Sequence, residues 1–177
     1  SGELATKFND MGIEIRNLQK TGKSSLQSIA SDLPTKNNIL FIHNTYSSKQ
    51  GIDFAVTNFP NCYFCLCPKS NLYIENRLPD MDLFKDYADK ITLGTDSLAS
   101  NDNLSILDEM FVLQSNHPQI TLLQLINWAT LNGARALDIE KKFGSIETGK
   151  KPGLNLLQNI DFKTMKLKKE STVLRLI

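Results

Sequence analysis

The sequence predicts an α/β fold with a parallel sheet, because three buried-strand patterns alternate with helical ones. The strand patterns are short and almost wholly apolar, at residues 39–42, 62–67 and 91–94. Such runs are typical of strands buried on both faces, as in parallel sheets. Each run ends in a polar segment and is followed by residues with the periodicity of a helix. Strands and helices are therefore expected to alternate with short connections.

The stretches around these runs have helical spacing and capping residues. Ser47 and Ser48 precede an expected helix at 49–58, and Ser24 or Ser25 can cap a short helix that ends before Pro34. Helices are also expected at residues 3–15, 81–88, 104–115 and 122–137. From residue 143 the chain becomes rich in turn-forming residues, with strand candidates at 154–157 and 165–177. We therefore predict two domains, residues 1–142 and a small β appendage at 143–177.

Length and composition narrow the function classes. The chain has 177 residues, of which 41% are hydrophobic, enough to build one core. With a net charge of +1, the chain lacks the excess positive charge that is typical of proteins that bind nucleic acid or an anionic membrane. No run approaches the roughly 18 apolar residues that span a bilayer, and the first residues lack the pattern of a secretion signal. We expect a cytoplasmic protein without nucleic-acid or membrane partners.

Three cysteines lie within six residues, at Cys62, Cys65 and Cys67. The Cys62-x-x-Cys65 spacing suggests zinc or redox chemistry, but residues three apart on a strand point to opposite faces. A tetrahedral site would also need a second Cys or His pair, which the sequence lacks. We interpret the three as buried, reduced cysteines that act as small hydrophobes.

Candidate functional residues follow each buried strand, where functional side chains of βα folds gather. Asp96 could bind a divalent metal and take a proton from water, and the alternative is a turn-capping aspartate. His43 could orient a substrate or bind metal, and the alternative is a loop histidine bonded to local backbone. Ser70 and Asn71, with Lys69, could donate hydrogen bonds to a ligand or cap a helix or turn.

The histidine count limits the metal chemistry of this chain. Its two histidines are His43 and His117, and His117 precedes Pro118 in what we expect to be a solvated loop without a catalytic role. A catalytic zinc site ordinarily takes three protein ligands. With Asp96 and at most His43 in suitable positions, these residues alone do not complete a mononuclear site.

Five motifs occur in a fixed order and carry a resemblance to a known family. They are Phe-Ile-His-Asn-Thr at 41–45, Cys-Leu-Cys-Pro-Lys-Ser-Asn-Leu at 65–72, Ile-Thr-Leu-Gly-Thr-Asp-Ser-Leu-Ala-Ser at 91–100, Trp-Ala-Thr-Leu-Asn-Gly-Ala-Arg-Ala-Leu at 128–137, and Phe-Gly-Ser-Ile-Glu-Thr-Gly-Lys-Lys-Pro-Gly-Leu-Asn-Leu-Leu at 143–157. Together they resemble the cytosine-deaminase-like branch of the amidohydrolase superfamily, which includes chlorohydrolases, guanine deaminase and S-adenosylhomocysteine deaminases. Pro152-Gly153 departs from the Ala-Asp that is usual in the family, and the first-strand His-x-His and fifth-strand His of the family have no counterpart here.

The resemblance implies the C-terminal portion of a TIM-type (β/α)8 barrel, with strands six to eight and part of a composite β domain. It implies hydrolysis of a C–N bond in an amino-substituted heterocycle, with zinc or iron as the metal of the full-length protein. Asp96 would bind this metal and transfer protons, and His43 would contact substrate. The segment alone is expected to hold no metal, to be inactive, and to need the missing N-terminal half of the barrel.

Other interpretations remain open from the sequence. A three-stranded arc leaves strand edges unpaired, which favours pairing with the missing half, homo-oligomer formation through the edges, or aggregation. A non-catalytic binding or regulatory module on a half-barrel is the alternative function. A flavodoxin-like binding domain is disfavoured because no Gly-rich phosphate loop follows any strand.

Overall fold

The computed structural model describes residues 3–13 and 22–177 and divides into two units, Ser1–Leu33 and Pro34–Ile177. In the first unit, α1 (Glu3–Asp10) covers part of the helix expected at 3–15, and residues 14–15 lie outside the described residues. The short helix α2 (Ser25–Ile29) begins with a capping box, in which Ser24 and Gln27 accept hydrogen bonds from each other's backbone N–H groups. A 3-10 turn, η1 (Ala30–Asp32), follows it.

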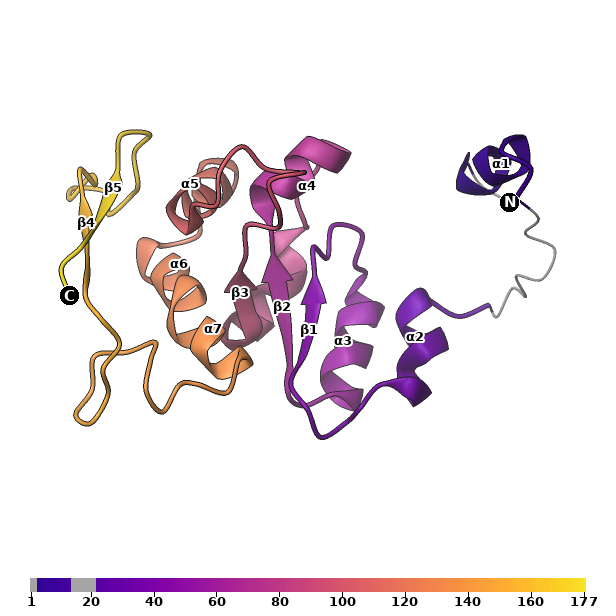
Figure 1. The fold of residues 1–177 in the computed structure, drawn as a ribbon, viewed down its shortest axis with the longest axis horizontal. Coiled ribbons are helices and arrows are strands. Elements are labelled where there is room, and N and C mark those ends of the chain that lie inside the picture. Colours follow the sequence, from indigo (N-terminus) through magenta and orange to yellow (C-terminus); the bar gives the residue numbers. More distant parts are fainter. Residues whose placement is uncertain (1–2, 14–21) are drawn as a thin grey trace. The chain divides into compact units, whose positions relative to one another are not determined.

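The second unit is built on the predicted parallel sheet. Its strands are β1 (Ile39–Ile42), β2 (Cys62–Leu66) and β3 (Ile91–Leu93), arranged in the order β1-β2-β3 (Figure 1). Phe41 pairs with Phe64, and Phe64 pairs with Ile91. Because all strands run in the same direction, their carboxyl ends lie at one edge of the sheet.

Helices connect and flank the strands. They are α3 (Lys49–Asn58), α4 (Pro68–Glu75), the 3-10 segment η2 (Met81–Lys90), α5 (Ile106–Asn116), α6 (Leu122–Ala129) and α7 (Leu131–Ala136). The helix expected at 81–88 is thus a 3-10 segment. The expected helix at 122–137 is in fact two helices. The Thr130 hydroxyl donates to the Ile126 carbonyl at 2.7 Å, and its backbone leaves helical geometry.

The core lies between the sheet and the helices that cover it. Among its fully buried side chains are Phe64, Leu66, Phe84, Leu113 and Leu125. The three cysteines are buried and free, as predicted. His117 is half-buried rather than solvated, and this burial lowers the pKa of its imidazole. No helix of the described residues is long and apolar enough to cross a membrane.

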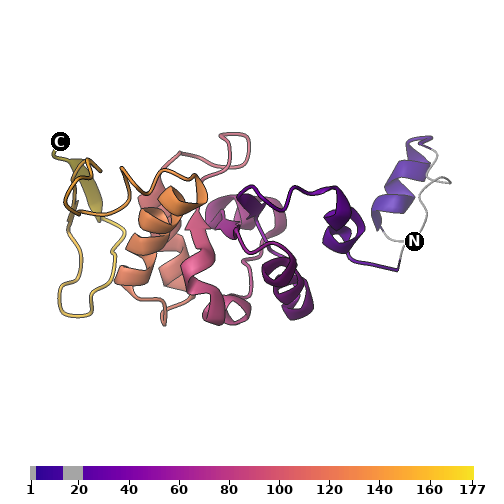
Figure 2. The same ribbon diagram turned by 90° about the horizontal axis from the view of Figure 1, so that it is seen from below.

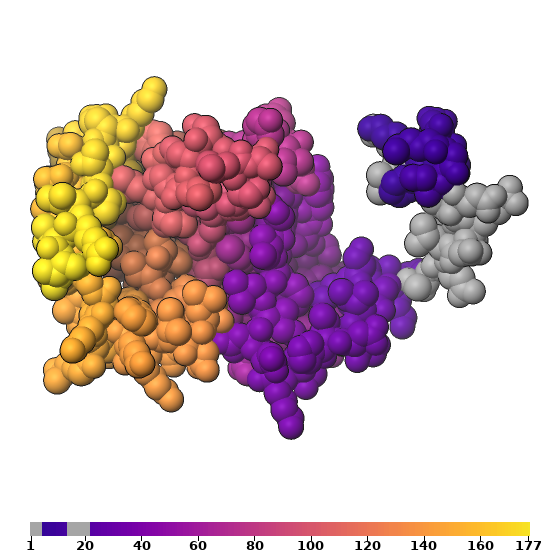
Figure 3. All heavy atoms as spheres, viewed as in Figure 1, coloured from indigo at the N-terminus to yellow at the C-terminus, as the bar shows by residue number. Residues whose placement is uncertain are grey.

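The C-terminal residues form a separate antiparallel pair, β4 (Asn155–Gln158) and β5 (Thr172–Arg175). Only part of the strand expected at 165–177 is therefore extended. Figures 2 and 3 show this hairpin at the end of the unit, next to helices α5 to α7. One anchor is Gln114 of α5, which accepts from the Leu167 N–H at 2.8 Å and donates to the Ile120 carbonyl at 3.1 Å. The division at residue 143 stays a prediction.

Candidate active site

The parallel sheet brings all four predicted site residues together. His43 follows β1, Ser70 and Asn71 lie in the first turns of α4 behind β2, and Asp96 follows β3. The His43 Nε2 and Asp96 Oδ2 atoms are 3.8 Å apart. Both side chains remain partly accessible, with 40% and 32% of their surface exposed. The cluster therefore has a solvent-facing layer of two ionisable groups.

Two hydroxyl groups hold the Asp96 carboxylate. Ser100 Oγ and Ser70 Oγ each donate to Asp96 Oδ2 at 2.8 Å, and both serines are buried. These hydrogen bonds, from Ser100 first and Ser70 second, lower the pKa of the Asp96 carboxyl below its ordinary value. Asp96 is thus kept ionised, and both hydroxyl groups donate to the same carboxylate oxygen, Oδ2.

Asn71 holds His43 through both ends of its side-chain amide. Asn71 Oδ1 lies 2.8 Å from His43 Nδ1, and Asn71 Nδ2 donates to the His43 carbonyl at 3.3 Å. A carbonyl only accepts, which fixes the amide orientation, so we infer that the proton sits on Nδ1. In neutral His43 the unprotonated Nε2 therefore faces Asp96.

The backbone is left-handed at His43 and Asp96, and also at Asn44, which follows His43. His43 has φ 69°, Asn44 has φ 58° and Asp96 has φ 56°. Residues other than glycine adopt this conformation at a cost and do so often at functional sites. At the ends of β1 and β3, this turn of the backbone brings both side chains to the rim of the sheet.

Sequence reasoning missed a second layer of polar residues behind Asp96. Besides Ser100, it contains Asn101 and the fully buried Glu109 of α5. Glu109 accepts from Lys69 N at 2.8 Å and from Asn101 Nδ2 at 2.7 Å. The available signal was an acidic residue within the apolar stripe of α5, next to Met110. Ser100 had no comparable signal.

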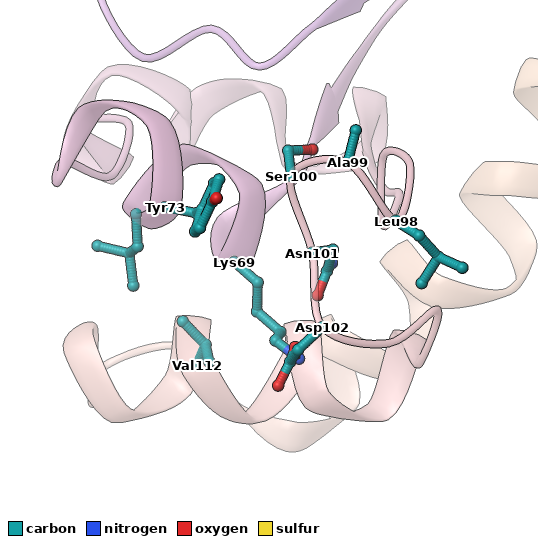
Figure 4. A pocket seen from close by; sticks show the side chains of 9 residues that line it. Lys69, Tyr73, Leu98, Ala99, Ser100, Asn101, Asp102 and Val112 are labelled. Carbon is teal, nitrogen blue, oxygen red and sulfur yellow. The ribbon is translucent and has the colours of Figure 1, made fainter.

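A pocket of about 430 Å³ lies between α4, α5 and the segment 98–102 (Figure 4). Its lining includes the exposed side chains of Tyr73 and Leu98 and the ion pair of Lys69 with Asp102. Ser100 also lines this pocket while its hydroxyl binds Asp96. The segment behind Asp96 is therefore accessible from its outer side.

The site residues can supply one ligand to a metal ion, but they do not form a complete metal site. Asp96 offers a carboxylate oxygen, which is a suitable ligand for zinc and other divalent ions. Within residues 3–13 and 22–177, no group of three or more His, Cys, Asp or Glu side chains is placed to bind a metal ion. Further ligands would have to come from elsewhere.

Comparison with known proteins finds deaminases. The adenosine deaminase of Helicobacter pylori is 32% identical over 120 residues, covering 66% of this chain and 29% of that protein. The 5-methylthioadenosine/S-adenosylhomocysteine deaminase of Moorella thermoacetica is 33% identical over 98 residues, covering 51% of this chain and 23% of that protein. The chain thus spans less than a third of either relative.

Solved structures show the same fold. A crystal structure of Helicobacter pylori aminofutalosine deaminase with methylthio-coformycin matches with a TM-score of 0.69 and 24% identity, over 93% of this chain and 40% of that chain. A zinc-bound adenosine deaminase from Xanthomonas campestris matches with a TM-score of 0.65 and 20% identity, over 84% of this chain and 38% of that chain. The predicted partial TIM-type barrel is confirmed. A sequence match to the amidohydrolase family over residues 11–177 shows that the chain belongs to that family.

Proposed function

We propose that this chain forms the last three strands of the pocket of a metal-dependent deaminase, which hydrolyses a C–N bond of an amino-substituted heterocycle. The observation that carries the proposal is the convergence of Asp96 and His43 from neighbouring strand ends, with Nε2 and Oδ2 3.8 Å apart. The names of its relatives suggest adenosine, 5-methylthioadenosine, S-adenosylhomocysteine and guanine as substrates to test.

Each residue would have a distinct role. A divalent metal, zinc or iron, would supply an activated water when bound. Asp96 would provide one ligand to it, and the same carboxylate would take a proton from the attacking water and pass it to the departing amino nitrogen. His43 would orient the electrophilic group of the substrate through Nε2. Ser70 and Ser100 would keep Asp96 in place, and direct contact of Ser70 or Asn71 with substrate stays a prediction.

We propose that a complete pocket needs barrel strands beyond this segment. The family relatives are about three to four times longer than the matched region, which supports this view. In the described sheet the outer strands β1 and β3 each pair with one neighbour. Unpaired edges recruit further strands, either from the rest of the barrel or from a second copy. The three free, buried thiols support a cytoplasmic location.

The test uses the full gene product, purified with its native metal. Metal content is measured by mass spectrometry, and ammonia release is measured with the four candidate substrates. D96N should lose both metal and turnover, whereas H43Q should keep the metal and lose about 10²- to 10⁴-fold in kcat. H117Q is the matched control, because His117 lies at the end of α5 and should leave both readouts unchanged.

Three outcomes would contradict the proposal. They are a gene product without divalent metal, a D96N variant with normal turnover, and robust turnover by pure 177-residue chain supplied with zinc. Tight binding of a nucleoside without turnover would instead favour the non-catalytic binding module.

A further inference from the structure

We propose that Glu109 is a positioning residue, which holds both hydroxyl donors of Asp96 in register from the buried side of the site. This inference rests on the proposed function, since it assigns Glu109 to the same carboxylate. It concerns a residue whose hydrogen bonds go to Lys69 and Asn101 rather than to Asp96 or His43, and which lies on a different element, helix α5.

The hydrogen bonds of Glu109 reach both segments that carry those donors. Its Oε2 accepts from the backbone N–H of Lys69 at 2.8 Å, and its Oε1 accepts from Asn101 Nδ2 at 2.7 Å. Lys69 directly precedes Ser70, and Asn101 directly follows Ser100. Each partner of Glu109 is therefore the chain neighbour of one hydroxyl that binds Asp96.

Asn101 extends this link to the other side of Asp96. Its Nδ2 also donates to the Thr95 carbonyl at 2.8 Å. Thr95 immediately precedes Asp96, and Asn101 immediately follows Ser100. The buried side-chain amide of Asn101 therefore connects the two ends of the segment that carries Asp96 and Ser100. Movement of Glu109 would thus displace the aspartate and its donors together.

Glu109 also caps helix α4. The N-cap residue of this helix, Cys67, makes no side-chain capping bond, and Pro68 has no N–H. The Lys69 N–H is one of the donors left over at a helix start, and a negative charge is favourable there. The Lys69 ammonium is engaged elsewhere, with Asp102 and Asn103. The Glu109 carboxylate therefore fixes the turn that carries Ser70.

A carboxylate at this place is costly to bury. Glu109 is fully buried, and burial raises its pKa above the ordinary 4.5 despite the two hydrogen bonds. An apolar residue like its neighbours Met110 and Leu113 would avoid this cost. The two hydrogen bonds to Lys69 and Asn101 each use a separate oxygen of Glu109, and a carboxylate offers two acceptor oxygens where an amide offers one.

The experiment compares E109L and E109Q with wild type in the full gene product. The matched control is Q114L, because Gln114 lies on the same helix, is also buried, and bonds two backbone groups, of Ile120 and Leu167, away from the site. Hydrogen–deuterium exchange by mass spectrometry reports on residues 67–75 and 94–103. Steady-state kinetics with the best substrate gives kcat and KM separately.

E109L should raise deuterium uptake in both segments and lower kcat by about 10- to 100-fold, with KM changed less than threefold. E109Q keeps one acceptor and should lie between E109L and wild type in both readouts, and it also serves if E109L does not fold. Q114L should raise uptake around residues 120 and 167 and leave kcat within about twofold of wild type.

Unchanged uptake in either segment of E109Q would overturn the inference, and so would an equal loss of kcat in Q114L. Failure of the proposed function is a separate result. If wild-type protein deaminates nothing, that proposal fails, while the exchange pattern of the variants still decides whether Glu109 holds the two segments.

Discussion

Gly94, two residues before Asp96, is the position where one methyl group should be most informative. A Cβ atom at Gly94 would lie 2.9 Å from Cys65 Sγ and 3.4 Å from Cys67 Sγ. Both thiols are buried, so neither can swing into solvent. The Gly94 N–H also donates to the Leu66 carbonyl at 2.9 Å, which ties its backbone to β2. G94A therefore overpacks a rigid site.

Overpacking of this kind costs about 1–3 kcal/mol. For a chain of this size it corresponds to a fall in Tm of about 2–12 °C, at about 2–4 °C per kcal/mol. The assay is urea unfolding of wild type, G94A, C65A and the double variant. Removal of the Cys65 thiol should relieve the clash, so the double variant should be more stable than the sum of single effects predicts, by about 0.5–3 kcal/mol.

Two results would refute this reasoning. One is a free energy of unfolding for G94A that differs from wild type by less than about 0.5 kcal/mol, which is the usual additivity error. The other is strict additivity in the double variant, which would mean that the added methyl group meets something other than Cys65.

Further predictions concern the polar network. N71L should shift the proton of neutral His43 from Nδ1 towards Nε2, because it removes the acceptor at Nδ1; ¹⁵N NMR of labelled histidine detects this, and an unchanged tautomer would contradict it. S100A should raise the pKa of the Asp96 carboxyl, because it removes the hydrogen bond that lowers this pKa most. A ¹³C NMR titration with an unmoved midpoint would argue against it. Burial raises the pKa of Glu109 in the folded protein, so the protonated form is favoured there more than in the unfolded chain. The resulting contribution to the free energy of unfolding is present below the ordinary pKa of 4.5 and is lost as pH rises through the pKa of the folded state. The free energy of unfolding of wild type relative to E109Q should therefore fall with rising pH, as measured by urea unfolding, and a constant difference would contradict the burial argument.

The strands were the part of the fold that local sequence could predict. Residues 39–42 match β1 in full, and residues 62–67 exceed β2 by one position, because a short apolar run between turn-forming residues favours a strand. β2 is largely buried, as expected, whereas β1 is only half-buried and its Ile42 is exposed. Helix α4 was not predicted. Its start depends on Pro68 at the first position and on a carboxylate 40 residues further along the chain, so the capping signal is not local.

The residues of the candidate site likewise fall into two groups, those that the sequence could predict and those that it could not. Asp96 and His43 follow from the rule that polar residues after parallel strands meet at one edge. Ser100 and Glu109 could not be derived from that rule, because their roles depend on how the segment after β3 folds back and on which face of α5 is buried. A charge inside an apolar helical stripe was the sole local sign of this second layer.

The geometry also helps to weigh the two interpretations of Asp96. An aspartate that only caps a turn needs nearby backbone donors, whereas Asp96 also accepts from Ser70, 26 residues earlier in the chain. Opposite it, His43 commits its Nδ1 proton to Asn71. Its Nε2 then lies 3.8 Å from Asp96 Oδ2. An unprotonated ring nitrogen and a carboxylate oxygen are both hydrogen-bond acceptors, so they face each other unfavourably unless a proton or a bound donor lies between them. Both side chains reach solvent there. A purely structural pair would close this gap with a direct hydrogen bond, so the arrangement favours a site that receives a hydrogen-bond donor from a ligand.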